Sequence, residues 1–367
     1  MIIRIGIKFR FSLRVISLMN KLVVLLIIVN TQVSSAQIGG KRSFEFLRLP
    51  TSGRISALGG SIIATADDDI NLALANPATL NEATNKAISI NYNFHFAGIN
   101  NGHAAYGFPI EKLGINAHIS STFINYGEFI AADEVGQQTG TFNASESALT
   151  FGASKIINER IVLGTNIKFA SSAFEQYGAN GLLADLGAIY STNEGRTKIA
   201  AVFQNFGVEL ARLNGNRYGT PYDVQVGLSN RLKYMPFRFS VILHRLHRWG
   251  IRYDDPNFRE VTNLFEEEES TSPLKGGVDN FFRHLIFNGE FLIGKNENFR
   301  LRGGYNHLRR AELSLSQFRS LAGFSLGFGI KINKFRIDYG VGYHHLAGGT
   351  NHLSISTNLN WFRSKLE

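Results

Sequence analysis

Hydrophobic and polar residues alternate along most of this chain with a period of two, the spacing of a β-strand whose two faces meet different surroundings. The stretch 88–96 reads Ile-Ser-Ile-Asn-Tyr-Asn-Phe-His-Phe, and the stretch 335–344 follows the same alternation. Apolar-out, polar-in strands of about ten residues are typical of a transmembrane barrel. The pattern predicts about fourteen strands, at residues 88–97, 102–109, 113–124, 146–155, 161–172, 181–191, 197–206, 222–230, 237–245, 283–294, 298–307, 320–332, 334–344 and 351–362.

The connections between these predicted strands alternate in length. Connections after even-numbered strands are short, whereas several after odd-numbered strands are long, namely 125–145, 207–221, 246–282 and 308–319. Outer-membrane barrels have short periplasmic turns and longer external loops. A soluble β-sandwich also alternates in polarity but gives no reason for this segregation of loops. We therefore expect an all-β fold, a transmembrane antiparallel β-barrel in the outer membrane whose long loops are exposed at the cell surface.

Composition agrees with a barrel. Charged residues make up 18% of the chain, below the roughly 25% of soluble domains, and the polar strand faces are rich in Gly, Ser and Asn. Aromatic residues recur near predicted strand ends, as at Tyr190, Phe206 and Trp361, where barrels carry interfacial girdles. The chain has no cysteine, which excludes disulfides, thiolate metal sites and cysteine nucleophiles.

The first 36 residues form the pattern of a secretory signal peptide. They contain five basic and no acidic residues, an apolar run over 22–29, and the small residues Ser34-Ser35-Ala36. The run is shorter than the ~20 residues of a membrane span, so we expect cleavage after Ala36; a retained anchor helix is the alternative. Without this segment the net charge falls from +9 to near +4 (33 basic against 29 acidic residues), so the basic balance is weak support for nucleic-acid binding.

Residues 37–86 lack the strand pattern and predict a periplasmic or plug segment that enters the barrel from the periplasmic side. Asp67-Asp68-Asp69 precede a short helix-compatible run, where acids suit the helix dipole, and Asn76-Pro77 ends that run. Gly59-Gly60 supplies a tight bend. The predicted organisation is a signal peptide over 1–36, the plug over 37–86, the barrel over 87–362 and a C-terminal tail over 363–367.

The predicted plug also carries a distinctive set of residues between positions 43 and 80. The positions concerned are Ser43, Phe44, Glu45, Phe46, Leu47, Leu49, Pro50, Arg54, Ala57, Leu58, Gly59, Gly60, Ala64, Ala66, Asp67, Asp68, Asn76, Pro77, Ala78 and Leu80. From Arg54 onward they resemble the N-terminal pattern of the fatty-acid-transporter-like (FadL-like) barrels, although Gly53 stands where that group often has Ala or Ser. The first part of this set, residues 43–50, narrows the resemblance to the PorQ-like branch of the type IX secretion system in Bacteroidota.

This resemblance implies a fourteen-stranded barrel with an N-terminal plug. It also implies a surface attachment complex in which the barrel mounts a PorZ-like protein beside PorU-like and PorV-like members, in contact with outer-membrane lipid and lipopolysaccharide. The barrel would be a scaffold and not an enzyme.

Candidate chemistry is sparse. His244 and His247 are predicted to point to opposite faces of a strand end, which disfavours a metal site, and no catalytic, phosphate-binding or dinucleotide motif occurs. We expect no cofactor. The long connection 246–282 is unusually aromatic, and long loops are often functional. We predict that it docks the surface partner through Trp249, Tyr253, Phe258, Phe265, Glu266, Glu267 and Phe281, with a solvated loop tip as the alternative for its acidic run 266–269.

Three functions remain open from the sequence. The first is the secretion-complex scaffold. The second is a transporter or channel for hydrophobic small molecules, as in the wider group of barrels. The third is a soluble periplasmic β-protein.

Overall fold

The computed structural model describes residues 42–363, apart from gaps at 96–97, 134, 193, 213–214, 216–217, 253–272, 314–319 and 346–347. The predicted signal peptide therefore lies outside the described residues, as does most of the predicted tail. Within the described part, the strands are β1 (Ala87–Phe94), β2 (Asn100–Ile110), β3 (Ile115–Ala132), β4 (Gln138–Asn158), β5 (Ile161–Phe174), β6 (Tyr177–Ser191), β7 (Thr197–Ala211), β8 (Asp223–Arg231), β9 (Phe237–Leu243), β10 (Leu285–Ile293), β11 (Phe299–Asn306), β12 (Phe324–Ile332), β13 (Phe335–His345) and β14 (Gly348–Asn358).

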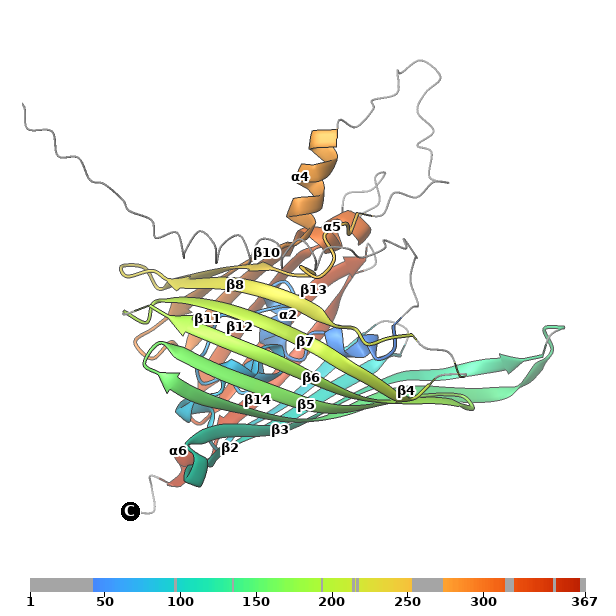
Figure 1. Ribbon diagram of the computed structural model, residues 1–367, viewed down its shortest axis with the longest axis horizontal. Helices are drawn as coiled ribbons and strands as arrows, with labels where there is room; N and C mark the ends of the chain where they lie inside the picture. Colours follow the sequence, from blue (N-terminus) through green and yellow to red (C-terminus); the bar gives the residue numbers. More distant parts are fainter. Residues whose placement is uncertain are drawn as a thin grey trace, which may run out of the picture. The chain divides into compact units, whose positions relative to one another are not determined.

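These fourteen strands form one closed antiparallel barrel, in which each strand pairs with its sequence neighbours and β1 pairs with β14 (Figure 1). The alternation of residues on β1 matches the expected faces. Ile90 and Phe94 point outward and are 63% and 52% exposed, whereas Ser89 and Asn91 point into the lumen and are at most 2% exposed. The predicted all-β antiparallel barrel of about fourteen strands is confirmed.

Two strands are much longer than predicted. β3 and β4 continue as a two-stranded hairpin beyond Asn125, up to the pairing of Ala132 with Gln138 (Figure 1). The prediction of a loop over 125–145 was wrong, because most of these residues have both strand faces in water and no longer alternate in polarity. On the barrel side of the hairpin, β2 pairs with β3 as far as Asn125 and β5 pairs with β4 as far as Ala144.

Other long connections contain helices. The connection predicted over 246–282 includes most of α4 (Pro273–Arg283), and the one predicted over 308–319 includes most of α5 (His307–Leu313). The predicted last strand, 351–362, was too long, since β14 ends at Asn358 and α6 (Asn360–Arg363) follows. Among the described residues, no helix has the length and hydrophobicity to cross a membrane.

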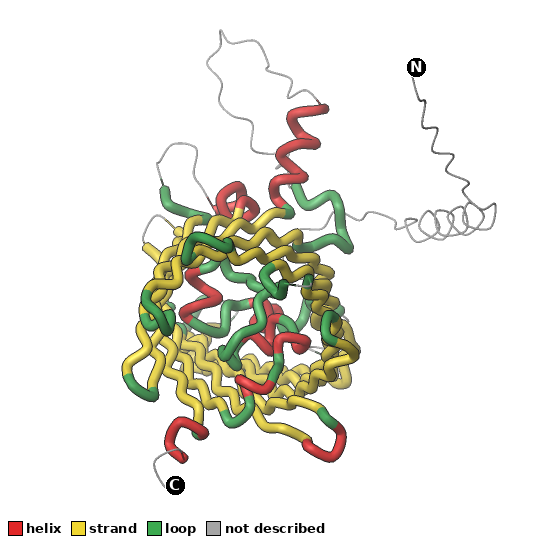
Figure 2. The backbone as a smooth tube through the Cα atoms, turned by 90° about the vertical axis from the view of Figure 1, so that its left-hand side faces the viewer, coloured by secondary structure: helices red, strands yellow, loops and turns green. Residues whose placement is uncertain are grey.

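The N-terminal segment fills the inside of the barrel (Figure 2), as predicted for a plug. Its helical turns are η1 (Glu45–Arg48), α2 (Gly53–Ala57), α3 (Leu72–Ala75), η2 (Pro77–Thr79) and η3 (Glu82–Thr84). The described plug begins at the long-loop end, where Ser43 N donates to Gly219 O, and ends at the short-turn end, where Lys86 N donates to Gly107 O. It thus runs the length of the lumen, and its first described residues do not lie at the short-turn end from which we expected it to enter.

Helix α2 lies directly on the barrel wall because glycines remove the side chains between them. A Cβ atom placed on Gly340 of β13 would lie 2.0 Å from the carbonyl oxygen of Gly53, and one placed on Gly327 of β12 would lie 2.5 Å from the Cβ of Ala57. Gly53 N donates a hydrogen bond to Ser354 Oγ of β14 at 2.8 Å. The plug is therefore seated in backbone contact with the last three strands.

Candidate functional site

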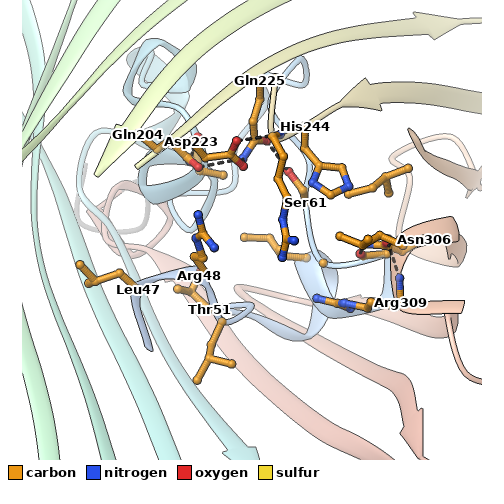
Figure 3. A pocket seen from close by; sticks show the side chains of 18 of the residues that line it. Leu47, Arg48, Thr51, Ser61, Gln204, Asp223, Gln225, His244, Asn306 and Arg309 are labelled. Carbon is orange, nitrogen blue, oxygen red and sulfur yellow. Dashed lines mark hydrogen bonds between the residues drawn. The ribbon is translucent and has the colours of Figure 1, made fainter. Parts of the chain in front are cut away.

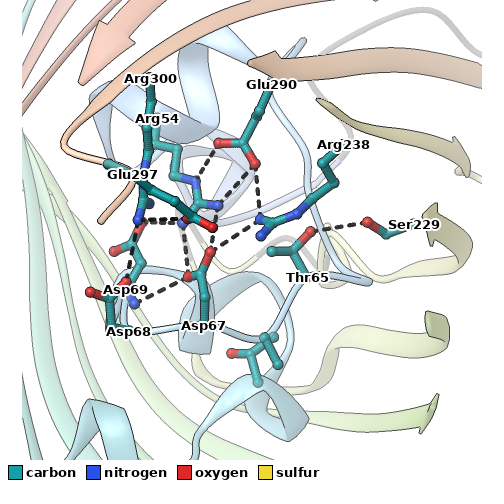
Figure 4. Close-up of polar contacts among 12 residues, drawn as sticks. Arg54, Thr65, Asp67, Asp68, Asp69, Ser229, Arg238, Glu290, Glu297 and Arg300 are labelled. Carbon is teal, nitrogen blue, oxygen red and sulfur yellow. Dashed lines mark hydrogen bonds and ion pairs between the residues drawn. The ribbon is translucent and has the colours of Figure 1, made fainter. Parts of the chain in front are cut away.

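An arginine at the centre of the plug ties it to the barrel wall. Arg54 of α2 is fully buried, and its Nε lies 3.0 Å from Oε1 of Glu290 on β10. The same guanidinium contacts Asp67 at 2.8 Å and Asp69 at 3.2 Å, both in the plug (Figure 4). Although burial opposes its charge, Asp67 and Glu290 hold the pKa of Arg54 above its ordinary value.

Further charges on the lumen face of β9 to β13 extend this contact. Glu290 also accepts from Arg302 at 2.9 Å and from Arg238 at 3.1 Å, and Arg302 pairs with Asp338 at 2.6 Å. The resulting group, called the lumen cluster below, comprises Arg54, Asp67, Asp68, Asp69, Arg238, Glu290, Arg300, Arg302, Arg336 and Asp338. It contains five arginines and five carboxylates, so its formal charge is balanced.

The lumen cluster corrects our interpretation of Asp67 and Asp68 as acids placed for a helix dipole, whereas Asp69 does lie at the start of this helical turn and accepts a hydrogen bond from Asn71 N at 3.1 Å. Helix α3 begins after Asn71, whose side chain makes no capping hydrogen bond. Asp67 pairs with Arg54 and Arg238, while Asp68 pairs with Arg336. These carboxylates therefore join the plug to strands distant in sequence. Although burial opposes its charge, Arg54 and Arg238 hold the pKa of Asp67 well below its ordinary value, whereas burial raises the pKa of Asp69.

The other plug residues singled out in the sequence act on the backbone. Asn76 is fully buried, its amide donates to Ile63 O at 2.8 Å, and its side-chain oxygen caps the turn at Ala78 N. Pro77 begins that turn. Gly59 and Gly60 have φ angles of +80° and +90°, a region that glycine adopts readily. The Gly59-Gly60 bend is therefore confirmed.

Two cavities lie on either side of this plug region. The first, called the loop-end cavity, has a volume of about 180 Å³ and faces the long-loop end (Figure 3). Its apolar side includes Ile55, Ile286 and Leu308, and its polar side includes Arg48, Asp223, His244, Arg245 and Arg309. The second, called the turn-end cavity, has a volume of about 710 Å³ and is lined by charged residues that include Asp68, Lys198, Arg231, Lys233 and Arg300.

His244 and His247 do not diverge as expected. Strand β9 ends at Leu243 and Arg245 takes a positive φ of 56°, so the chain turns before His247 is reached. Both rings are largely buried near Asp223, and His247 Nδ1 lies 3.5 Å from Oδ1 of that carboxylate. No group of three potential metal ligands occurs among the residues that the structure describes.

The predicted docking connection is described only in part. Tyr253, Phe258, Phe265, Glu266 and Glu267 lie outside the described residues, so their role stays a prediction. Trp249 and Phe281 are 57% and 40% exposed with ring centroids 6.3 Å apart, and Trp249 stacks on His284 at 4.9 Å. Phe282, next to Phe281 on α4, is 42% exposed. The structure thus brings together Trp249 and Phe281, the two predicted residues that it describes.

Sequence reasoning missed the wall half of the lumen cluster and, apart from His244, the polar residues of the loop-end cavity. A signal for the first was present, because Arg300, Arg302, Arg336 and Asp338 occupy polar positions of alternating strands. Charges are unusual on the Gly-, Ser- and Asn-rich lumen face. No comparable pattern marked Arg245 and Arg309, which come from separate connections, and His244 was considered only as a metal ligand.

Comparisons with known proteins agree with the barrel. The toluene transporter TodX of Pseudomonas putida has a TM-score of 0.50 and 11% identity, covering 84% of this chain and 96% of TodX. A deltaS2 mutant of TodX, a monoaromatic hydrocarbon channel, has a TM-score of 0.51 and 12% identity, covering 84% and 97%. The CymD monoaromatic hydrocarbon channel has a TM-score of 0.50 and 12% identity, covering 84% and 96%. At these identities the likeness shows the fold alone; the neighbours themselves are a transporter and channels.

No curated protein matches the chain. The model of an uncharacterised protein family, UPF0164, matches residues 25–212, which include the whole plug and strands β1 to β7. This match spans slightly more than half of the residues of the chain. The chain therefore belongs to the uncharacterised protein family UPF0164.

Proposed function

We propose that this protein is an outer-membrane channel for small hydrophobic molecules. The observation that carries the proposal is the shared backbone with TodX and CymD, named as a toluene transporter and a monoaromatic hydrocarbon channel, over 84% of this chain. An outward face of residues such as Ile90, Phe94 and Phe151, all more than half exposed, suits the acyl chains of a membrane.

The size of the loop-end cavity supports a small substrate. A cavity of about 150 Å³ in another protein holds benzene, and this one measures about 180 Å³. Ile55, Ile286 and Leu308, each 3% exposed, supply its apolar side. A molecule with a single ring fits this volume.

The plug separates the two cavities. Ser61, Leu74 and Ala75 line the loop-end cavity, whereas Ala64 to Asp68, between them in sequence, line the turn-end cavity. A substrate that passes from one cavity to the other through the plug would displace residues 61–75. The lumen cluster holds the part of this segment around Asp67.

The channel proposal is tested with a deletion strain. Uptake of radiolabelled toluene should fall relative to the parent and return when the wild-type gene is supplied. Unchanged uptake of toluene and of longer hydrophobic compounds in the deletion strain would rule the channel out.

A second candidate is the scaffold of a type IX attachment complex. Two observations favour it: the Ser-Phe-Glu-Phe-Leu-Arg-Leu-Pro lead at 43–50, and the exposed aromatic patch formed by Trp249, Phe281 and Phe282. Aromatic residues are enriched at the centres of protein interfaces. In this role the loop end would hold a PorZ-like protein beside PorU-like and PorV-like members, with lipopolysaccharide around the barrel.

The scaffold is tested separately. Type IX cargo should fail to reach the cell surface in the deletion strain, and a tagged barrel should co-purify the surface partner from solubilised outer membrane. Alanine at both Trp249 and Phe281 should abolish that co-purification, while alanine at Tyr234 of the short-turn end, which is more exposed than either, should not. Normal surface cargo in the deletion strain would contradict the scaffold.

A further inference from the structure

A groove crosses the rim of the barrel at its short-turn end, between the turn that joins β6 to β7 and the turn that joins β8 to β9. It has a volume of about 520 Å³ and is called the rim groove below. It shares Glu194, Arg196, Arg231, Leu232 and Lys233 with the turn-end cavity. These shared residues make the rim groove continuous with the lumen.

Two further residues of the rim groove place its other end on the outside of the wall. Thr197 of β7 pairs with Asn230 of β8, and the Asn230 amide donates to Thr197 Oγ1 at 2.6 Å. Lys198, the next residue of β7, points into the lumen, where its Nζ donates to Ala66 O of the plug at 2.8 Å. Since the side chains of a strand alternate between its two faces, Thr197 and Asn230 point outward.

The rim groove carries more positive than negative charge. The described residues that line it include three cations, Arg196, Arg231 and Lys233, and one carboxylate, that of Glu194, which pairs with Arg196. Arg231 pairs with Glu297 of the next short turn at 2.7 Å, yet about half of its side chain stays exposed. Lys233 is exposed and has no carboxylate partner within the described part of the chain. The rim groove can therefore accept an anion.

An apolar row lies beside these cations on the outer face of the wall. Tyr190 of β6 pairs with Ile199 of β7, which pairs with Leu228 of β8, and all three side chains are exposed. The turn after β8 also exposes Tyr234 and Met235. Aromatic and apolar side chains next to basic ones are typical of a membrane interface. A soluble anion would contact the cations alone, whereas a lipid would contact both the cations and the apolar row.

We propose that the rim groove binds an anionic phospholipid of the periplasmic leaflet, with its phosphate on the three cations and its acyl chains along the apolar row. Arginine and lysine both bind phosphate groups, and basic residues near a membrane surface attract anionic lipids. This inference goes beyond the proposed channel, because it concerns the surrounding membrane and not passage through the lumen. Phosphatidylglycerol is the probe, and phosphatidylcholine, whose headgroup has no net charge, is the comparison lipid.

The test measures lipid binding to the purified full chain in detergent by native mass spectrometry. Wild-type protein should bind phosphatidylglycerol at least about five-fold more tightly than phosphatidylcholine. Lys233→Gln and Arg231→Gln should each weaken binding of phosphatidylglycerol about five-fold, the effect expected of one basic residue near a membrane surface. Arg231→Lys should lose less because it keeps the charge. Each variant is checked for folding by its separate band on a denaturing gel of unboiled samples.

Glu194→Gln tests the site in the opposite direction. It removes the carboxylate that pairs with Arg196, so phosphatidylglycerol should bind more tightly than to wild type. A gain in binding cannot result from a failure to fold. Lys112→Gln is the matched control, because Lys112 lies on the short turn between β2 and β3, is exposed and does not line the rim groove.

Three results would overturn the site. They are equal binding of the two lipids, equal loss of phosphatidylglycerol binding in Lys112→Gln and Lys233→Gln, and weaker binding in Glu194→Gln. Displacement of the lipid by an equal concentration of soluble glycerol 3-phosphate would also overturn it, because the phosphate alone would then account for binding. Lipid binding is measured without transport, so unchanged toluene uptake in the deletion strain would reject the channel and leave this site in place.

Discussion

Arg54 Nε and Glu290 Oε1 lie 3.0 Å apart although 236 residues separate them in the chain. Both side chains are almost completely buried, at 1% and 2% exposure. This ion pair connects the helix seated inside the barrel to a strand of its wall. Asp67, Asp69, Arg238 and Arg302 pair directly with one of these two residues, whereas Asp68 pairs with Arg300 and Arg336.

Glu290→Gln should destabilise the protein strongly, because it leaves the buried charges of Arg54 and Arg302 without their shared carboxylate. Removing one partner of a buried pair costs about 3–5 kcal/mol. On a denaturing gel of unboiled samples, a folded barrel runs as a separate band. The temperature at which this band disappears should therefore fall by many degrees. Glu194→Gln is the control, since the Glu194 side chain is 69% exposed and a surface pair contributes about 0–1 kcal/mol. If the two substitutions had equal effects, the buried ion pairs of Glu290 would not be what stabilises the protein.

The stability of the plug should decrease at acid pH. The folded-state pKa of Asp67 lies below its ordinary value of 3.8, so its ion pairs stabilise the fold above about pH 3.8 and are lost as the pH falls through the lowered value. The effect of Asp69 on stability has the opposite sign. Because its pKa is raised in the folded state, the folded state becomes less stable as the pH rises and Asp69 ionises.

Asp67→Asn isolates the first of these effects. The variant should unfold at a lower temperature than wild type near pH 7, and the difference should shrink as the pH is taken below about 3.8. Thermal unfolding across this range is the measurement. A difference that is constant with pH would show that Asp67 contributes through packing and not through its charge.

Locking the plug to the wall should stop transport if residues 61–75 must move. Thr65 Oγ1 of the plug and Ser229 Oγ of β8 lie 3.4 Å apart, close enough for two cysteines in their places to form a disulfide. The chain has no cysteine of its own, so Thr65→Cys with Ser229→Cys creates a single possible bridge. Toluene uptake should be lost under oxidation and restored by reduction, while Thr65→Cys alone should transport in both states. Full uptake by the oxidised double variant would rule out movement at this point.

The contact between α2 and the barrel wall should not tolerate a residue larger than glycine. Gly340→Ala would place a methyl group 2.0 Å from the Gly53 carbonyl oxygen, and the backbone must shift to relieve this overlap. Overpacking of this kind costs about 1–3 kcal/mol. Gly303→Ala on β11 is the control, because its Cβ would have no neighbour closer than 3.8 Å. Proteolysis within the plug should rise in the first variant only, and equal proteolysis in both would contradict the close packing.

The projecting part of the β3–β4 hairpin should be dispensable for the barrel. Residues 127–142 lie beyond the last pairs of β2 with β3 and of β4 with β5, so a short turn in their place removes no wall contact. The shortened protein should keep its unfolding temperature to within a few degrees. A large loss would mean that the hairpin stabilises the barrel from outside.

The number and order of the strands were predictable because each strand buries one face, and burial imposes alternation on the sequence. The same reasoning failed for β3 and β4 past Asn125, where residues such as Glu128, Phe129 and Ile130 are exposed and neither face is selected. The plug motif marked Arg54 and Asp67 as unusual. Their partners Glu290 and Arg238 could not be assigned, because local sequence carries no information on which lumen charges meet across the barrel.

The loop-end cavity was beyond sequence reasoning for a related reason. Its charged residues come from the plug, from the first residue of β8, from the connection after β9 and from α5, and each has an ordinary sequence context. The conformation of Arg245, with its positive φ, decides that His244 and His247 turn toward Asp223. A backbone conformation at a single residue produces no periodic pattern in the sequence.

The position of Arg54 also constrains the order of assembly. Its plug is made before any of the strands, yet the wall residues that hold it, from Arg238 to Asp338, belong to the second half of the chain. The N-terminal segment cannot reach its final contacts until those strands have been synthesised and brought alongside. Insertion of the C-terminal strands and seating of the first segment are therefore parts of the same late event in biogenesis.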